Sequence, residues 1–143
     1  MARIPPSKRA DFDLFRPVPT RWNDNDLYGH MNNAIHYQLF DTAVNGWLIE
    51  TGLLKFGDDT AFIVAETGCR YHGDIMFPDM VHAGLRIERL GGSSVIWQIG
   101  LFRAESEEAA ADGRFVHVHV TSKGHKPIPM TQAQRAVLEP LVK

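Results

Sequence analysis

The chain has 143 residues, a length that predicts one domain, and its 44% hydrophobic and 22% charged residues are ordinary for a globular protein. The formal net charge of −2 argues against a nucleic-acid partner. No apolar run is long enough for a membrane span, and the single cysteine, Cys69, excludes an internal disulfide, so we expect a cytoplasmic protein that binds no membrane.

The first half of the chain predicts a strand, a loop and a long helix. Residues 1–13 mix prolines and charges and predict a loose arm. Residues 15–22 predict an edge strand or a bent strand, because two prolines interrupt them. After a polar loop, Asn32 or Asn33 is expected to cap a helix over residues 34–53.

The predicted helix is apolar around most of its circumference. Gln38, Asp41 and Asn45 form one narrow polar stripe, and a helix with so little polar surface is expected to be buried. Gly46 lowers helix stability, and close approach of another backbone would offset that cost. Gly52 is expected to end the helix.

The second half of the chain predicts an antiparallel sheet. Gly91-Gly92 indicates a hairpin turn, and Thr131 is expected to cap a short C-terminal helix. This order favours an α+β architecture, one sheet wrapped around one helix, whose unpaired edge favours dimerisation. The expected strands are rich in Val, Ile, Phe and Tyr and cover residues 60–66, 69–76, 80–90, 93–103 and 114–121.

The loop before the helix carries the strongest functional signal. It reads Asp24-Asn25-Asp26-Leu27-Tyr28-Gly29-His30-Met31-Asn32-Asn33. A helix N-terminus offers unpaired N–H groups and a partial positive charge. A carboxylate beside it can act on a carbonyl that those N–H groups polarise, so the loop predicts a catalytic site.

This loop, the following helix down to Asp41 and the element order over residues 18–129 resemble the hotdog-fold acyl-CoA thioesterases, specifically the 4-hydroxybenzoyl-CoA thioesterase-like family. The resemblance implies a hotdog fold, an antiparallel sheet wrapped around one long central helix. It also implies hydrolysis of an acyl-CoA or acyl-carrier thioester to acid and thiol. No cofactor is expected besides coenzyme A as part of the substrate, and the assembly is expected to be a homodimer or homotetramer.

The resemblance assigns roles residue by residue. Asp26 matches the catalytic carboxylate, the backbone N–H of Asn33 the donor to the thioester carbonyl, and Gly29 the turn through which backbone approaches substrate. Asp41 stands where the family usually has Glu, and His36 stands where Tyr is commoner.

Several chemical choices stay open at this level. Asp26 could attack the thioester directly or activate water. His30 could orient Asp26, contact substrate or only fix the loop. Asp41 could position the water, face a partner subunit or form a structural pair, and Asp24 could be a second acid or a turn residue.

Substrate contacts are expected in two places. Tyr28 and Gly29 belong to the loop itself. Contacts to the phosphates and pantetheine of coenzyme A are expected from residues at strand ends, although surface basic residues are often merely solvated. These are Arg89, Ser94, Lys123 and Lys126.

The sequence supports other functions and other kinds of site less strongly. A hotdog hydratase or dehydratase typically has an Asp-x-Asn-Pro-x-His pattern, which the stretch from Asp26 to His30 lacks, and a non-enzymatic acyl-CoA-binding protein is the other alternative. His117 and His119 alternate on a strand whose valines are expected to form the core face, but no third ligand is visible, so no metal site is predicted. Cys69 near His72 lacks an acid and is expected to be a packed strand residue.

Overall fold

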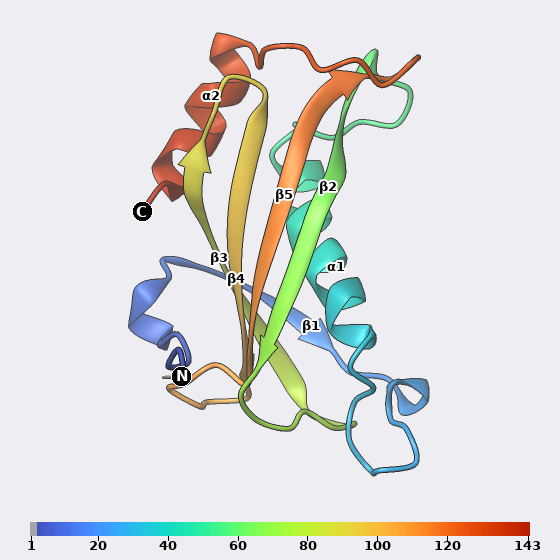
Figure 1. Ribbon diagram of the computed structural model, residues 1–143, viewed down its shortest axis with the longest axis vertical. Coiled ribbons are helices and arrows are strands. Elements are labelled where there is room, and N and C mark those ends of the chain that lie inside the picture. Colours follow the sequence, from blue (N-terminus) through green and yellow to red (C-terminus); the bar gives the residue numbers. More distant parts are fainter. Residues whose placement is uncertain (1–2) are drawn as a thin grey trace.

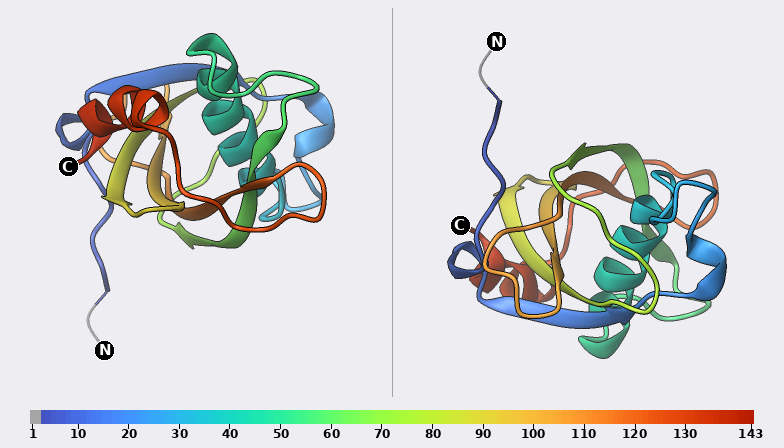
Figure 2. Two further views of the ribbon diagram at one scale, coloured as in Figure 1. Left: turned by 90° about the horizontal axis from the view of Figure 1, so that it is seen from above. Right: turned by 90° about the horizontal axis from the view of Figure 1, so that it is seen from below.

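A computed structural model describes residues 3–143. Five antiparallel strands form one sheet in the order β1-β3-β4-β5-β2, so β1 and β2 are its edges. The sheet curves, and α1 lies along its concave side (Figures 1 and 2). The elements are β1 (Leu14–Pro19), α1 (Ile35–Glu50), β2 (Thr60–Tyr71), β3 (Met80–Leu90), β4 (Ser94–Arg103), β5 (Ala111–Thr121) and α2 (Gln132–Leu138).

Helix α1 has 16 residues, which is shorter than the predicted span of 34–53 and is not the long helix expected. Gly52 ends it as predicted, with φ +80° and its N–H donating to the Ile49 carbonyl. The helix buries one face against the sheet, while Gln38, Asp41 and Glu50 stay exposed. The predicted burial is therefore confirmed for this face only: Gln38 and Asp41 belong to the predicted polar stripe, but the exposed surface also includes Thr42 and Ile49. The buried side chains are His36, Leu39, Phe40, Ala43, Val44, Trp47 and Leu48.

Strand β2 is one continuous strand of 12 residues, where the sequence predicted two strands. A bulge between Val64 and Glu66 lets it follow the curved sheet without breaking its pairing with β5. Residues 72–79 form a connector to β3 and not the end of a second strand. The strand predicted over 80–90, the hairpin at Gly91 and the Thr131 cap of α2 are confirmed.

Strand β5 turns the opposite way from the prediction. His117 and His119 lie on the same face as Gly113 and are each 1% exposed, whereas Val116 and Val118 are half-buried on the other face. Val120 is also on that other face and is 1% exposed, where Pro127 pairs with it. The strand begins at Ala111, and Gly113 lies directly under the Phe40 ring, so every second residue from there points inward. Valine and histidine alternate here, and the alternation alone does not say which set faces the core.

Gly46 makes room for a side chain, not for a backbone. A Cβ at this position would lie 2.8 Å from Nη2 of Arg16. Arg16 comes from β1 and forms an ion pair with Glu50 at 2.7 Å, which ties the end of α1 to an edge strand. The close approach that the sequence predicted is therefore present, but its partner is a guanidinium group.

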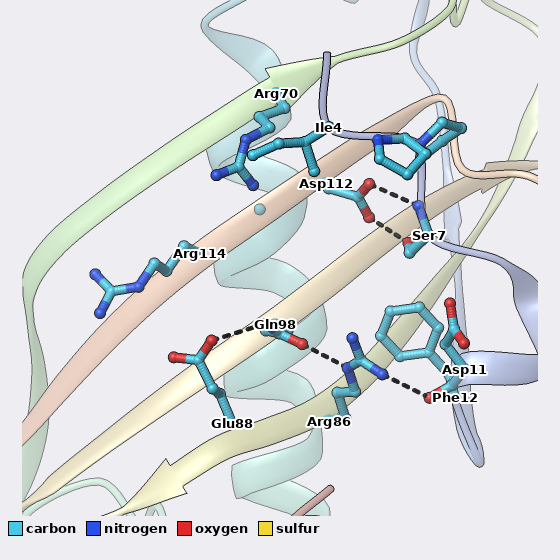
Figure 3. A pocket seen from close by; sticks show the side chains of 13 residues that line it. Ile4, Ser7, Asp11, Phe12, Arg70, Arg86, Glu88, Gln98, Asp112 and Arg114 are labelled. Atoms are coloured by element: carbon cyan, nitrogen blue, oxygen red, sulfur yellow. Dashed lines mark hydrogen bonds between the residues drawn. The ribbon is translucent and has the colours of Figure 1, made fainter. Parts of the chain in front are cut away.

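The segment of residues 7–12 is docked on the convex face of the sheet, away from α1, where the sequence predicted a loose arm. Ser7 N–H donates to Asp112 at 2.9 Å, and the Arg9 guanidinium lies over the Phe15 and Phe102 rings. Phe12 fills a hollow above two strand glycines. Beside this segment lies a groove of about 500 Å³, shown in Figure 3, whose charged lining residues are Asp11, Arg70, Arg86, Glu88, Asp112 and Arg114. None of the helices in residues 3–143 combines the length and hydropathy that a membrane crossing needs.

Candidate active site

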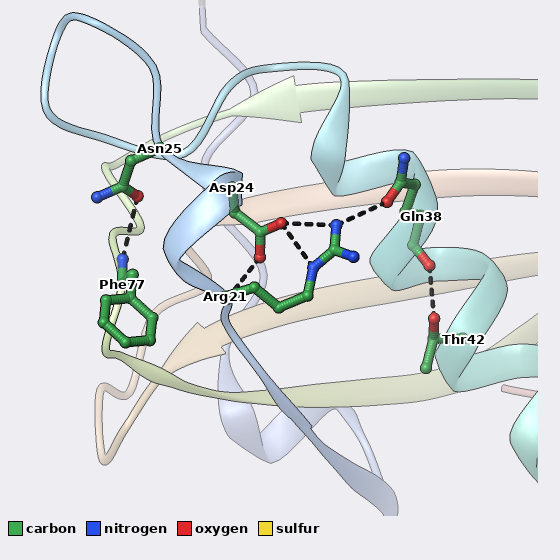
Figure 4. Close-up of polar contacts among 6 residues, drawn as sticks. All are labelled: Arg21, Asp24, Asn25, Gln38, Thr42 and Phe77. Atoms are coloured by element: carbon green, nitrogen blue, oxygen red, sulfur yellow. Dashed lines mark hydrogen bonds and ion pairs between the residues drawn. The ribbon is translucent and has the colours of Figure 1, made fainter.

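Asp24 is a structural residue of the loop before α1. It is 1% exposed, accepts the Arg21 N–H at 2.7 Å and pairs with the Arg21 guanidinium at 2.9 Å. Arg21 in turn reaches the Gln38 amide oxygen on α1 at 3.3 Å (Figure 4). A buried acid that is paired in this way fixes the loop against the helix and is not available to a substrate.

The loop is also joined to the 72–79 connector after β2. Asn25 accepts the Phe77 N–H through its side-chain oxygen at 3.1 Å (Figure 4). The buried Met31 donates its N–H to the Ile75 carbonyl at 2.6 Å. These bonds place the two segments side by side, so both can line one site.

Asp26 lies in the tight turn of this loop and is half-buried. Its Oδ1 accepts the Tyr28 N–H at 2.8 Å, and its own N–H donates to the His30 carbonyl at 3.1 Å. Gly29 completes the turn at φ +84°, a conformation that glycine adopts without strain. Among residues 3–143, Oδ2 of Asp26 makes no hydrogen bond and the carboxylate has no ion-pair partner. The turn therefore holds a carboxylate with one free oxygen.

Asn33 provides a free backbone donor at the start of α1. The side chain of Asn32 accepts the Ala34 N–H at 3.0 Å just before the helix, but the N-cap residue of α1 is Ala34, so the prediction that Asn32 or Asn33 caps the helix is wrong. No hydrogen-bond acceptor for the Asn33 N–H lies among residues 3–143. An unpaired N–H at this helix end carries part of the positive end of the helix dipole and can polarise a carbonyl.

A cavity of about 160 Å³ opens at this helix start. Asp26 is not in its lining, but His30, whose carbonyl binds the Asp26 N–H, is. Three of the lining residues, namely His36, Tyr71 and Asp74, were not among the predicted catalytic or substrate-binding residues. The full lining is His30, Met31, Asn33, His36, Tyr71, Gly73, Asp74 and Ile75.

Tyr71 connects the end of β2 to the helix start. Its hydroxyl donates to the Asn33 carbonyl at 2.6 Å, and its ring packs edge-on against His36 with centroids 4.8 Å apart. His36 could have been found from its spacing, because it lies one turn after Asn33 on the same helix face. Tyr71 and Asp74 carry no such signal, since only the fold brings β2 to this place.

The other predicted residues of the loop and helix take different positions. Tyr28 is 84% exposed and stacks on His30, whose Nδ1 lies 3.3 Å from the Met31 carbonyl. Asp41 lies two turns into α1 on its exposed face. Partial burial raises the pKa of Asp41, and the Asn45 amide opposes this effect. His30 therefore belongs to the cavity, and Asp41 does not.

The predicted coenzyme A contacts lie at the opposite end of the sheet from the start of α1 (Figure 1). Arg89 is near the end of β3, Ser94 begins β4, and Lys123 and Lys126 follow β5. The structure does not bring these four residues to the cavity within one chain.

Two weaker alternatives from the sequence were a metal site at His117 and His119 and a nucleophilic thiol at Cys69. Residues 3–143 contain no cluster of three or more potential metal ligands. Burial raises the pKa of Cys69 to about 11, so this side chain is a thiol at neutral pH, and His72 pairs with Asp112 at 3.0 Å.

Comparisons with known proteins agree with this fold. The crystal structure of the PA5185 protein from Pseudomonas aeruginosa PAO1 is 42% identical, has a TM-score of 0.93 and covers 97% of this chain and 98% of its own. PA2801 of P. aeruginosa, proposed to be a thioesterase, is 27% identical with a TM-score of 0.81 over 86% of this chain and 95% of its own. Slr0204, a 1,4-dihydroxy-2-naphthoyl-CoA thioesterase from Synechocystis, is 17% identical with a TM-score of 0.77 over 89% and 96% and shares the fold. The family model for the thioesterase-like superfamily matches residues 20–138, and the chain belongs to that superfamily of hotdog-fold proteins.

Proposed function

We propose that this protein hydrolyses acyl-coenzyme A thioesters to a free acid and coenzyme A. The observation that carries the proposal is a pair of unsatisfied groups, the Asn33 N–H at the start of α1 and the free oxygen of Asp26 in the loop before it. Thioester hydrolysis needs a carbonyl polariser and a base or nucleophile, and these two groups supply both. Membership of the thioesterase-like superfamily supports the same reaction class, as does the coenzyme A thioester named for Slr0204.

In the proposed reaction the thioester oxygen accepts a hydrogen bond from the Asn33 N–H, which stabilises the negative charge that develops on that oxygen. The Asp26 carboxylate then acts in one of two ways. It removes a proton from a water that attacks the carbonyl carbon, or it attacks that carbon and forms a mixed anhydride that water opens. In both routes the C–S bond breaks and the thiolate leaves and takes up a proton. Neither route requires a metal or a redox cofactor.

A two-fold dimer would complete the site. Pairing β2 with its own copy about a two-fold axis is antiparallel, so the Thr60 end of one strand meets the Tyr71 end of the other. Thr60 pairs with Thr121 at the end of β5, and the predicted phosphate contacts Lys123 and Lys126 follow directly. In such a dimer the lysines of the second copy approach the cavity of the first, which a single chain does not allow.

The experiment is a measurement of thiol release from a panel of acyl-CoAs that vary in chain length and substitution, with EDTA present throughout. We expect release from at least one of them with unchanged rate in EDTA. Hydration of an enoyl-CoA, monitored in parallel, should be absent. Tight binding of the whole panel without any thiol release would refute the hydrolase and favour a binding protein.

A further inference from the structure

The two peptide groups that flank Asn33 contain four polar groups, and hydrogen bonds hold three of them. The Asn32 carbonyl accepts the Ile35 N–H at 2.9 Å, and the Ala34 N–H donates to the Asn32 side chain at 3.0 Å. The Asn33 carbonyl accepts the Tyr71 hydroxyl at 2.6 Å. The Asn33 N–H has no acceptor in the part of the chain that the structure describes. Because peptide groups are planar, bonds to the other three groups fix the direction of this N–H.

Only one of these three bonds comes from outside the helix start. The other two join residues two or three positions apart, so they set the local conformation and move with it. The bond from Tyr71 spans 38 residues and joins Asn33 to the last residue of β2. It therefore determines where the Asn33 peptide groups lie relative to the sheet.

The side chain of Tyr71 is held at two points and is suited to this contact. Its ring packs edge-on against His36 on α1, with centroids 4.8 Å apart. Its hydroxyl lies at the short end of the usual range for an O–H···O bond. Partial burial raises the pKa of Tyr71 above its usual value, so the hydroxyl keeps its proton and remains a donor. Both Tyr71 and Asn33 line the cavity at the start of α1.

The proposed function requires the Asn33 N–H to meet the charge that develops on the thioester oxygen. A donor of this kind lowers the barrier when it is oriented before the reaction, because reorganisation during the reaction would offset the gain. We propose, on the basis of the proposed function, that Tyr71 is a positioning residue that orients the Asn33 N–H for the thioester oxygen by holding the Asn33 carbonyl. In this role Tyr71 does not touch the reacting atoms.

The first test removes only the hydroxyl. Tyr71→Phe keeps the ring against His36, and we expect kcat for thiol release to fall at least about 5-fold, less than the roughly 100- to 1,000-fold loss of a whole donor. KM should change by less than about 2-fold, because the charge on the oxygen develops only in the transition state. The donor analogue para-aminophenylalanine in place of Tyr71 should restore most of kcat. If Tyr71→Phe fails to fold, para-methylphenylalanine replaces it, since it fills the space of the hydroxyl without donating.

An infrared measurement separates a change in position from a loss of folded protein. In carba(dethia) butyryl-CoA, a methylene replaces the thioester sulfur, and the carbonyl remains and can carry an isotope label. Its acyl group is short enough for a cavity of about 160 Å³. The band of the bound carbonyl should lie at lower wavenumber and be narrower in the wild-type protein than in Tyr71→Phe, because a well-aligned donor weakens the C=O bond. The amount of folded protein changes the height of the band but not its position.

Thr20→Val is the matched control. The Thr20 hydroxyl also donates to a distant carbonyl at 2.6 Å, that of Asp79, but neither residue lines the cavity. This change should leave kcat and the carbonyl band unaltered. Unchanged kcat in Tyr71→Phe, the same band in Tyr71→Phe and the wild type, or no binding of the analogue by the wild type would overturn the role of Tyr71. Absence of thiol release from every acyl-CoA would refute the proposed hydrolysis, whereas a band shift in Tyr71→Phe would still show that Tyr71 positions the donor.

Discussion

Asp24 and Asp26 are two residues apart, and their surroundings give them different roles. Asp24 is buried against the Arg21 guanidinium, so its charge is already neutralised. Asp26 keeps one oxygen free, in the loop before a helix whose Asn33 N–H is also free. A sequence motif contains both acids, but only the pairing partners show which of them can act on a substrate.

Replacement of Asp26 by Asn should lower kcat for thiol release by at least about 100-fold, the usual effect of removing a positioned base or nucleophile. Asparagine preserves the size of the side chain and can still accept the Tyr28 N–H. The loop should therefore keep its shape, and circular dichroism should show a folded protein.

The matched control for this change is Asp13→Asn, an exposed acid just before β1, at the sheet edge opposite β2. Its kcat should equal that of the wild-type protein. Near-normal thiol release by folded Asp26→Asn would remove Asp26 from the mechanism.

His117 makes stability depend on pH. Burial lowers its pKa from 6.5 to about 4, so between these values the unfolded chain binds more protons than the folded protein. The free energy of unfolding should therefore fall as the pH drops through this window, by about 3 kcal/mol in all for this group. Urea unfolding of the wild-type protein and His117→Leu at several pH values measures the effect. The variant should lose less stability than the wild type on acidification, and identical pH dependence would show that His117 does not titrate as described.

At the scale of the elements, the contact between α1 and β5 depends on a missing side chain. A Cβ on Gly113 would overlap the Phe40 ring, so Gly113→Ala must shift the helix or the ring. Overpacking of this kind should lower the free energy of unfolding by about 1–3 kcal/mol. Gly68→Ala on β2 is the control, because no atom lies within 4 Å of its added methyl group. Equal stability of the two variants in urea would contradict this account of the packing.

Most helices and strands could be predicted from residues close together in the sequence. The elements that were predicted wrongly depend on contacts between segments far apart in the sequence. Gly52, Gly91 and Thr131 mark ends and turns through their own conformations, and the structure confirms all three. Strand β2 was predicted as two pieces because the sequence near Gly68 reads as a break, but pairing along β5 holds it together through a bulge. The inward side of β5 depended on Gly113 under Phe40, a contact across the core that no pattern within β5 reveals.

The same division holds for the site. The loop from Asp26 to Asn33 is contiguous, so its groups could be recognised from the sequence. His36, Tyr71 and Asp74 meet only through the fold. The predicted contacts to coenzyme A lie at strand ends, but the sequence does not say at which end of the sheet each of those strand ends lies. The strand directions in the fold place all four at the end away from the cavity.

At the scale of the whole molecule, β2 is an edge strand whose centre is uncovered. Val64 and its next three neighbours are exposed, although Val64 is apolar. Exposed strand edges of this kind are commonly paired in natural proteins. Light scattering should therefore show a dimer, and specific activity should fall on dilution together with the dimer fraction.

A charge at the centre of this edge should weaken the dimer. We expect Val64→Lys to raise the dimer dissociation constant by at least about 10-fold and to lower activity at low protein concentration, because pairing would bury the new charge. Ala133→Lys adds the same charge on the exposed face of α2 and should change neither quantity. A fully active wild-type monomer at assay concentration would show that the site does not need a second subunit.

The hydrogen bonds that join the 22–33 loop to the 72–79 connector have a consequence for how a substrate is received. Met31 donates to Ile75 and Phe77 donates to Asn25, so two segments more than 40 residues apart are ordered together when the sheet forms. The loop then loses its conformational entropy during folding and not during binding. The Met31 amide should accordingly exchange its hydrogen with solvent only as fast as the whole sheet opens, with or without a ligand.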